Sequence, residues 1–551
     1  MAAVVSNGNV DYSKNNSCNK IQECNIKEEK LLNGKNNHQS NGYVRSTLLT
    51  NGVAKESYEE EMPWDGRGPV PRMQWARYDT WPGSFEKCSL LTAALTHLGL
   101  YILMMLGFLN QLLFKPRGAV ERNREGYAPL YNPFEQFFSR YVYRRVRHIF
   151  NRPICSAPGA TLVLKERHTD DYNWTFSWSG SRRTCINLGS YNYLGFAEGE
   201  GPAAAAAAAA ARTLGLALGS ARAELGSTPL HRDLEDATAE FLGVEAAIVF
   251  GMGFATNSLV IPALVGPGAL VLSDENNHAS LILGLRLARV SVRVFRHNDL
   301  AHLERLAREA IQEGKWTKIV IMVEGVYSME GSIVPLRGVV ALKRRLGLQL
   351  YLDEAHSVGA LGPRGRGVCD HHGVDPADVD VLMGTFTKSF GAAGGYIAGS
   401  RRLVRWVRQH GHAHTYAHAM APAVAAQVLA AMRALAAPAG AARLRRLRDN
   451  TRYFRARLQE MGVVVFGSEE SPVVPLLVYT FSKMAATVER LTACGVATVG
   501  VGFPATPLNK ARIRFCLSAA HSREQLDASL AAVERVADEL GLRYARRRGP
   551  R

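Results

Sequence analysis

A lysine lies at the centre of the stretch Gly384-Thr385-Phe386-Thr387-Lys388-Ser389-Phe390-Gly391. The apolar run from Val379 to Met383 precedes it and is typical of a buried strand. Lysine is usually a surface residue, but this one lies among small and hydroxyl residues just past that strand. An unpaired cation is costly in such a place unless it has a task. The stretch therefore indicates a functional lysine at the end of a strand.

Three more apolar runs lie earlier in the chain, and each is followed by polar or small residues. These runs are Ala247 to Phe250, Ile319 to Val323 and Leu348 to Leu352, and amphipathic segments such as Leu303 to Ile311 and Leu336 to Leu346 alternate with them. The alternation predicts an α/β fold with a mostly parallel sheet covered by helices. Ligand sites in such sheets lie at the carboxyl ends of the strands. We therefore expect a site built from the residues that follow each run.

Two of the stretches that follow these runs combine with Lys388 into a recognisable chemistry. Gly251 to Asn257 is a strand-to-helix turn whose small residues let backbone N–H groups approach a phosphate. Asp353 follows another strand and precedes Lys388 by 35 residues. A lysine forms a Schiff base with an aldehyde cofactor, and a buried carboxylate keeps a pyridine nitrogen protonated, which makes the ring an electron sink. The combination predicts a site for pyridoxal 5'-phosphate.

The motifs resemble those of the α-oxoamine synthases, enzymes of the aminotransferase-like fold type I. Within that family they look most like the catalytic long-chain-base subunits of serine palmitoyltransferases. The resemblance covers about residues 130 to 540, and it implies a large pyridoxal-phosphate domain over 186–440 and a smaller C-terminal α/β domain over 441–541, preceded by an N-terminal catalytic extension over 115–185. The matching stretches are 186–195, 251–258, 273–280, 323–331, 351–362, 384–399 and 502–521.

The resemblance implies a role for each matching residue of the cofactor site. Lys388 would carry the cofactor and move the α-proton of the substrate, and Asp353 would pair with the pyridine nitrogen. His356 would hydrogen-bond the ring hydroxyl, and His278 would stack on the ring face. The other expected cofactor contacts are Ser328 and, for the phosphate, Thr385, Thr387 and the backbone at Gly253 and Phe254. No metal is expected in this site.

The same resemblance implies the substrate contacts and the reaction. Arg514 would receive the amino-acid carboxylate, with Arg512 as the competing candidate, and Tyr191 and Asn192 would line the substrate mouth. The reaction would join L-serine to palmitoyl-CoA with loss of coenzyme A and carbon dioxide. The product would be 3-ketosphinganine, which makes this the first step of sphingolipid biosynthesis.

The resemblance also implies partners, and two other functions stay open. A lysine-lacking subunit would complete a heterodimer, and small membrane subunits would regulate it. One alternative is another α-oxoamine synthase that uses glycine and a shorter acyl-CoA. The other is a non-catalytic scaffold subunit, against which Lys388 itself argues because the silent subunits of this family lack that lysine.

A hydrophobic segment over residues 89–114 contains no charged residue and is long enough to cross a bilayer, which takes about 20 residues. It begins too far from Met1 to be a cleaved secretory signal. The four cations Lys115, Arg117, Arg122 and Arg124 follow it, so the catalytic part is expected in the cytosol, at the endoplasmic reticulum membrane if the resemblance holds. A helix lying in the membrane surface is the alternative. The acceptor triplet Asn173-Trp174-Thr175 should carry no sugar if the catalytic part is cytosolic.

Composition sets further bounds. Residues 1–60 are polar and predicted to be disordered, 61–88 form a juxtamembrane segment, and 542–551 form a basic tail. The net charge of +17 comes without a nucleic-acid-binding motif, so solvated helix faces, anionic lipid or coenzyme A explain it better. Eight cysteines without a CxxC pair give no disulfide or zinc framework. The histidines between His410 and His418 are interpreted as a polar loop in preference to a metal site.

Overall fold

The computed structural model of the chain describes residues 73, 75, 89–114 and 133–545. The polar segment 1–60, nearly all of 61–88, the cations that follow the hydrophobic segment and the end of the basic tail lie outside these residues. The predictions made for them stay predictions. Nearly all described residues fall in one compact unit, formed by Glu61–Lys115 and Gln136–Arg551.

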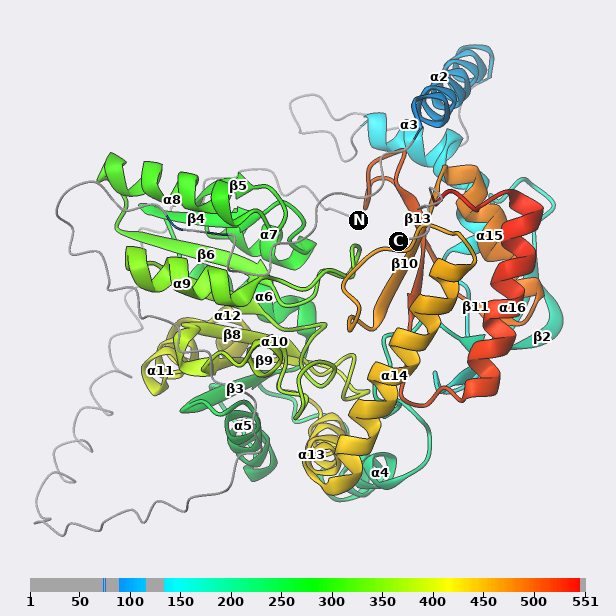
Figure 1. The fold of residues 1–551 in the computed structure, drawn as a ribbon. Coiled ribbons are helices and arrows are strands. Elements are labelled where there is room, and N and C mark those ends of the chain that lie inside the picture. The colour runs from blue at the N-terminus through cyan, green and yellow to red at the C-terminus, as the bar shows by residue number, and fades with distance from the viewer. Residues whose placement is uncertain (1–72, 74, 76–88, 115–132, 546–551) are drawn as a thin grey trace, which may run out of the picture. The chain divides into compact units, whose positions relative to one another are not determined.

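A seven-stranded sheet forms the centre of the fold (Figure 1). Its strand order is β3-β9-β8-β7-β6-β4-β5, and every neighbouring pair is parallel apart from the two pairs that involve β9. The predicted α/β class with a mostly parallel sheet is confirmed, and so are the four predicted strands, to within two residues. The strands are β3 (Ala246–Phe250), β4 (Ala269–Asp274), β5 (Ser291–Phe295), β6 (Lys318–Glu324), β7 (Gln349–Asp353), β8 (Val381–Thr385) and β9 (Gly395–Gly399).

Both faces of the central sheet are buried, because its side chains alternate between two hydrophobic layers. Along β7, Leu350 and Leu352 belong to one layer and Tyr351 to the other. The helices that close the first layer are α5 (Pro229–Leu242), α8 (Leu300–Glu313), α9 (Leu336–Leu346) and α13 (Pro422–Ala436). Those of the second are α6 (Gly253–Leu264), α7 (Ala279–Leu287) and α11 (Arg401–His410). Shorter pieces are α10 (Val368–His372), η3 (Pro376–Asp378) and α12 (His412–Thr415). Both predicted amphipathic segments are confirmed as helices.

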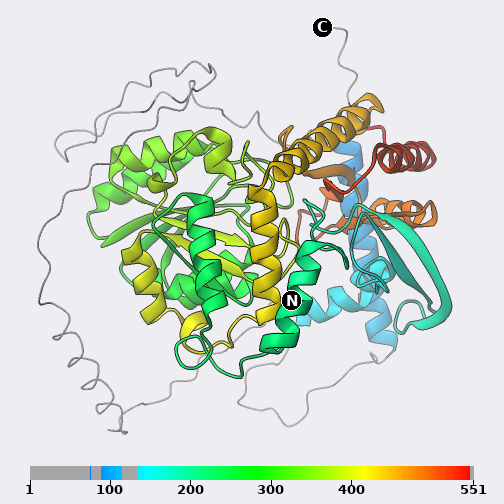
Figure 2. The ribbon, with the colours of Figure 1, turned by 90° about the horizontal axis from the view of Figure 1, so that it is seen from below.

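Two three-stranded sheets are built with the C-terminal part of the chain. One has the order β10-β13-β12, with β10 (Val473–Tyr479), β12 (Val499–Val501) and β13 (Ala511–Cys516). The other joins β11 (Val496–Ala497) to a long hairpin of β1 (Thr161–His168) and β2 (Ser177–Asn187), drawn in teal in Figure 2. The helices of this part are α14 (Pro438–Glu460), α15 (Phe481–Ala493) and α16 (Arg523–Leu540) (Figure 1).

The hairpin therefore links the predicted N-terminal extension to the predicted C-terminal domain. Val496 lies opposite Ile186 in a parallel pair. The boundaries proposed between residues 115 and 541 stay predictions. The alanine-rich helix α4 (Pro202–Leu214) follows the hairpin and packs against α13 (Figure 1).

The predicted hydrophobic segment forms helix α2 (Leu90–Leu113), which begins after the cap residue Ser89. It is the one unbroken helix among the described residues with the length and apolarity to cross a membrane. Gly107 is its single buried residue, and the neighbouring Phe108 ring stacks on Phe137 of α3 (Pro133–Tyr141) at 4.1 Å between centroids. The 3₁₀ helix η2 (Tyr143–Ile149) then leads to the hairpin. Large apolar side chains exposed along α2 are consistent with membrane association.

Candidate active site

Lys388 lies in the loop after β8, half-buried, and its Nζ donates to the Thr385 hydroxyl at 3.4 Å. Burial lowers the pKa of Lys388 from 10.5 to about 8, with the charge of Arg514 acting in the same direction and the carboxylates of Asp353 and Glu324 opposing it. A lysine with that pKa is partly neutral near physiological pH, and the neutral amine is the nucleophile and the base. The predicted functional lysine therefore has an environment that suits its chemistry.

Asp353 ends β7, the strand next to β8, and is only 4% exposed. Its Oδ2 accepts a hydrogen bond from Asn257 Nδ2 at 2.8 Å, and its Oδ1 accepts one from the Ala355 N–H at 2.8 Å. The Tyr351 hydroxyl in turn donates to Asn257 Oδ1 at 2.6 Å. A buried carboxylate held this way by neutral groups keeps its negative charge available for a cationic N–H group.

The first turn of α6, Thr385 at the end of β8 and Thr387 just after it form a cradle for an anion. Gly253 begins α6, so N–H groups without helical partners lie there. A Cβ atom on Gly253 would lie 3.0 Å from Thr385 Cγ2 and 3.3 Å from the Gly394 carbonyl oxygen, so a larger residue there would press against both neighbours. The Thr387 hydroxyl donates to that of Thr385 at 3.2 Å. The predicted phosphate contacts are thus brought together.

Two histidines of the predicted site lie near these groups. His356 Nδ1 is hydrogen-bonded to the Tyr193 hydroxyl at 2.8 Å, and burial holds the pKa of His356 well below its usual value, with Lys388 and Arg514 adding to the effect. His278 is the cap residue of α7, and its pKa is also lowered, by burial first and against the pull of Asp353. Both rings are therefore neutral and can contact an aromatic cofactor without adding charge.

The structure gives Arg514 and Arg512 different surroundings. Arg512 forms an ion pair with Glu330 at 3.3 Å and donates to the carbonyl oxygens of Met329 at 2.7 Å and Lys510 at 3.1 Å. Arg514 is 5% exposed, and its Nε has no hydrogen-bond partner within the described residues. The Arg512 guanidinium thus stabilises the fold, and the Arg514 guanidinium retains N–H groups that can bind an anion.

Tyr191 lies between Lys388 and Arg514. The Lys388 Nζ is 5.7 Å from the centre of its ring, and the Arg514 guanidinium carbon is 4.6 Å from it. Asn192 donates from Nδ2 to the Pro158 carbonyl at 3.1 Å and accepts from the Ala197 N–H at 3.1 Å, so its side chain stabilises the loop that carries Tyr191. Ser328 is buried in the loop after β6. Direct contacts of Asn192 and Ser328 with bound molecules stay predictions.

The histidines interpreted as a polar loop lie partly in helices, since His410 ends α11 and His414 is in α12, and their side chains contact different partners. The His410 ring stacks on Trp406 at 3.8 Å between centroids, and His414 Nε2 lies 3.5 Å from a guanidinium nitrogen of Arg408. Across the described part of the chain, no three His, Cys, Asp or Glu side chains gather as a metal would require. These residues thus belong to local packing.

The site residues fit the cofactor predicted from the sequence. Lys388 would bind the aldehyde of the cofactor, and Asp353 would pair with its ring nitrogen. The cradle at the start of α6 would hold its phosphate. Sequence reasoning did not assign roles to Asn257 and Tyr193, although both lie in motifs that it quoted. The spacing of Gly253 and Asn257 by one helical turn places them on one face of α6, a signal that could have identified Asn257.

Comparisons with known proteins agree with this geometry. A family model described as aminotransferase class I and II matches residues 183–533. Serine palmitoyltransferase 3 of Homo sapiens is 47% identical over 536 residues, which cover 94% of this chain and 95% of that protein. Long chain base biosynthesis protein 2a of Arabidopsis thaliana is 44% identical, over 77% of this chain and 88% of its own length. A solved structure described as SPT with PLP internal aldimine has a TM-score of 0.66 and 26% identity, and covers 75% of this chain and all of that one.

Proposed function

Because the chain belongs to the serine palmitoyltransferases, within the class I and II aminotransferase family, we propose that it is the catalytic subunit of such an enzyme and uses pyridoxal 5'-phosphate. It condenses L-serine with palmitoyl-CoA to give 3-ketosphinganine. The observation that carries the proposal is the proximity of three groups: the Lys388 amine and the Asp353 carboxylate, which follow or end neighbouring strands of the central sheet, and the Arg514 guanidinium of β13, whose Nε has no hydrogen-bond partner within the described residues.

Each group has a defined task in that reaction. The cofactor, when bound, supplies an electron sink for the bonds at the serine α-carbon. Asp353 holds its ring N–H, and the α6 cradle with Thr385 and Thr387 holds its phosphate. Arg514 binds the serine carboxylate, and the neutral Lys388 amine accepts the α-proton.

Bonds and protons balance across the reaction. The α-carbon forms a bond to the acyl carbon of palmitoyl-CoA, the thioester C–S bond breaks, and coenzyme A leaves as a thiolate that takes a proton from solvent. The bond from the α-carbon to the carboxyl carbon then breaks, and carbon dioxide leaves. A proton returned to the α-carbon, with Lys388 as its donor, completes 3-ketosphinganine.

The membrane setting follows from the lipid nature of substrate and product. Helix α2 attaches the chain to the endoplasmic reticulum membrane, and the catalytic part faces the cytosol. A lysine-lacking subunit forms the heterodimer, and small membrane subunits regulate it. The exposed apolar surface of α2 supports this arrangement.

The decisive experiment purifies the full chain from membranes with its associated subunits and supplies labelled serine and palmitoyl-CoA. Expected are 3-ketosphinganine, a visible absorption band from the lysine-bound cofactor, and loss of both with Lys388→Ala. Glycine with acyl-CoA of graded length tests the alternative substrate pair in the same preparation. Product from Lys388→Ala at the original rate would overturn the proposal, and absence of the band in the unchanged protein would favour a scaffold subunit.

A further inference from the structure

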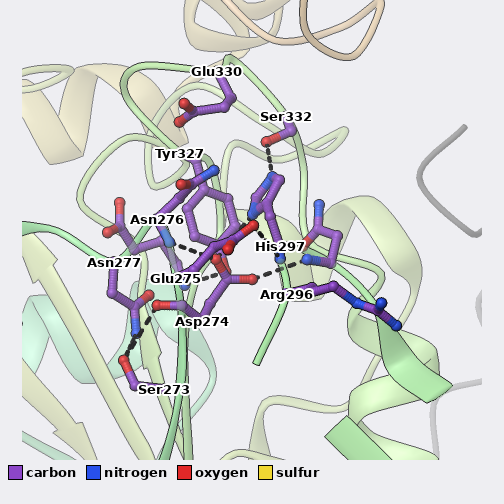
Figure 3. A network of polar contacts seen from close by, with 12 residues as sticks. Ser273, Asp274, Glu275, Asn276, Asn277, Arg296, His297, Tyr327, Glu330 and Ser332 are labelled. Carbon is purple, nitrogen blue, oxygen red and sulfur yellow. Dashed lines mark hydrogen bonds and ion pairs between the residues drawn. The ribbon is translucent and has the colours of Figure 1, made fainter. Parts of the chain in front are cut away.

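A buried aspartate outside the cofactor contacts organises the loop after β4 (Figure 3). Asp274 ends β4, and its side chain is fully buried. Its Oδ1 accepts from the Asn276 N–H at 2.9 Å and lies 2.9 Å from His297 Nδ1, while its Oδ2 accepts from the Asn298 N–H at 3.0 Å. Three hydrogen-bonding atoms of two loops thus converge on one carboxylate.

His297 joins this carboxylate to the loop between β6 and α9. Its Nε2 lies 2.7 Å from the Ser332 hydroxyl, and its ring packs edge-on against Tyr327 at 4.4 Å between centroids. Burial alone would lower the pKa of His297, but its hydrogen bond to Asp274 and the charges of Asp274, Glu330 and Glu275 raise it overall. The His297 Nδ1 donates to the Asp274 carboxylate, and Nε2 is hydrogen-bonded to the Ser332 hydroxyl. Since Ser332 is fully buried, the Asp-His-Ser arrangement cannot act as a nucleophilic triad on an external substrate.

The loop from Gly325 to Pro335 contacts the strand that carries Arg514. Glu330 pairs with Arg512, and the Met329 carbonyl accepts from the same guanidinium. The Met329 sulfur lies 4.0 Å from an Arg514 guanidinium nitrogen. Arg512 and Arg514 point to the same side of β13 because strand residues two apart share a face.

The loop is also held tightly against the neighbouring strand β10. Gly331 has a φ of +65°, and a Cβ atom on it would lie 2.4 Å from the Val473 carbonyl oxygen. The Ile333 N–H donates to the Ser468 hydroxyl at 3.0 Å. Because contacts on both sides hold this loop, a shift of His297 would also shift the loop residues that contact Arg512 and Arg514.

We propose that His297 is a positioning residue for recognition of the amino-acid carboxylate. Clamped between Asp274 and Ser332, it fixes the loop 325–335, and the loop fixes the Arg514 guanidinium through Met329 and through the Glu330–Arg512 pair. The proposal rests on the proposed function, since it assigns Arg514 the serine carboxylate.

A ligand pair that differs only in the carboxylate provides the test. The full chain with its associated subunits is titrated with L-serine and with L-serine amide, in which an uncharged amide replaces the carboxylate, and the change in the visible cofactor band is followed. In His297→Gln, the dissociation constant of serine is expected to rise about tenfold or more, the value of a charge-assisted hydrogen bond. The dissociation constant of serine amide should change less than about twofold in the same variant.

Two further variants make the result interpretable. His302→Gln is the matched control, because this half-buried histidine in the first turn of α8 accepts from the Arg296 N–H at 3.1 Å and serves a local turn. Ser332→Ala removes one clamp contact with little loss of volume, and it should reproduce a smaller loss specific to serine. Equal weakening of both ligands in His297→Gln and Ser332→Ala, or no weakening, would overturn the proposal. A protein with a cofactor band that serine never alters would instead contradict the proposed function.

Discussion

Asn257 Nδ2 donates a 2.8 Å hydrogen bond to Asp353 Oδ2, and this bond joins α6 to the end of β7. Asn257→Ala should weaken binding of the cofactor roughly tenfold, because a hydrogen bond to a charged group contributes about 1.5–3 kcal/mol and Asp353 would lose its orientation. The measurement is a titration of stripped protein with pyridoxal phosphate, followed by visible absorption. Tyr351→Phe removes only the hydroxyl that is hydrogen-bonded to Asn257, so it should weaken cofactor binding less than Asn257→Ala does. Unchanged affinity in Asn257→Ala would contradict this role.

The pKa of Lys388, lowered to about 8, sets the pH dependence of cofactor attachment. Only the neutral amine attacks an aldehyde, so the attachment rate should rise about tenfold per pH unit below this pKa and level off above it. Stopped-flow absorption of stripped protein mixed with pyridoxal phosphate gives the profile. A rate that keeps rising towards the ordinary lysine pKa of 10.5 would show that burial does not tune this amine.

Replacing each arginine of β13 by glutamine should have a different effect. Arg514→Gln is expected to raise KM for serine roughly 10- to 100-fold at little cost in stability, because it removes the charged partner of the substrate and, within the protein, the weak contacts with the Tyr191 ring and the Met329 sulfur. Arg512→Gln leaves Glu330 and the Met329 carbonyl buried without their donor, so it should lower the free energy of unfolding by roughly 1–3 kcal/mol. Serine kinetics and thermal unfolding, measured on both variants, separate the roles. If Arg512→Gln raised KM for serine and Arg514→Gln lowered the free energy of unfolding, the two arginines would have the opposite roles.

The close approach of α2 and α3 depends on Gly107. A Cβ atom there would lie 2.9 Å from ring atoms of Phe137 and Tyr141, whereas a Cβ on Gly99 would meet no described atom within 4 Å. Gly107→Leu should therefore weaken the contact by about 1–3 kcal/mol, and Gly99→Leu is the matched control. The contact between the two helices can be measured by cross-linking cysteines introduced at positions 110 and 141, whose native side chains are in contact. Equal cross-linking in both variants would contradict this packing.

Two acceptor triplets test the membrane topology together. Asn173, whose Nδ2 donates to the Arg145 carbonyl at 3.4 Å, should carry no sugar if the catalytic part is cytosolic. The sequence Asn15-Asn16-Ser17 lies on the other side of α2 and should be modified if α2 spans the bilayer. Glycosidase treatment and mass spectrometry of chain from microsomes read out both sites. Sugar on Asn173 would reverse the orientation, and none on either would indicate a helix on the membrane surface.

The fold and the centre of the site could be predicted because their signals are local. An apolar run followed at once by Asp353 or Lys388 identifies both the strand and its carboxyl end. The strand β8 nevertheless ends two residues later than predicted, because Thr385 still pairs with Gly395 of β9. The strand β9 itself contains two glycines, which weaken any strand pattern.

The residues that support the site could not be predicted because their partners are distant in sequence. Asn257 and Asp353 are 96 residues apart, and His297 and Ser332 are 35 apart. No periodicity encodes such pairs, since each depends on which strands become neighbours. The choice between Arg512 and Arg514 also required the fold, because it is the β6–α9 loop that occupies Arg512.

The pairing of β11 with β2 bears on the order in which the polypeptide is made. Val496 reaches its neighbour Ile186 only after 310 further residues have been translated, which takes about 15–60 s at roughly 5–20 residues per second. During that interval the hairpin next to the hydrophobic helix presents an open edge to whatever is nearby. The newly made chain would thus need shielding by a chaperone or by the lipid surface until Val496 emerges from the ribosome.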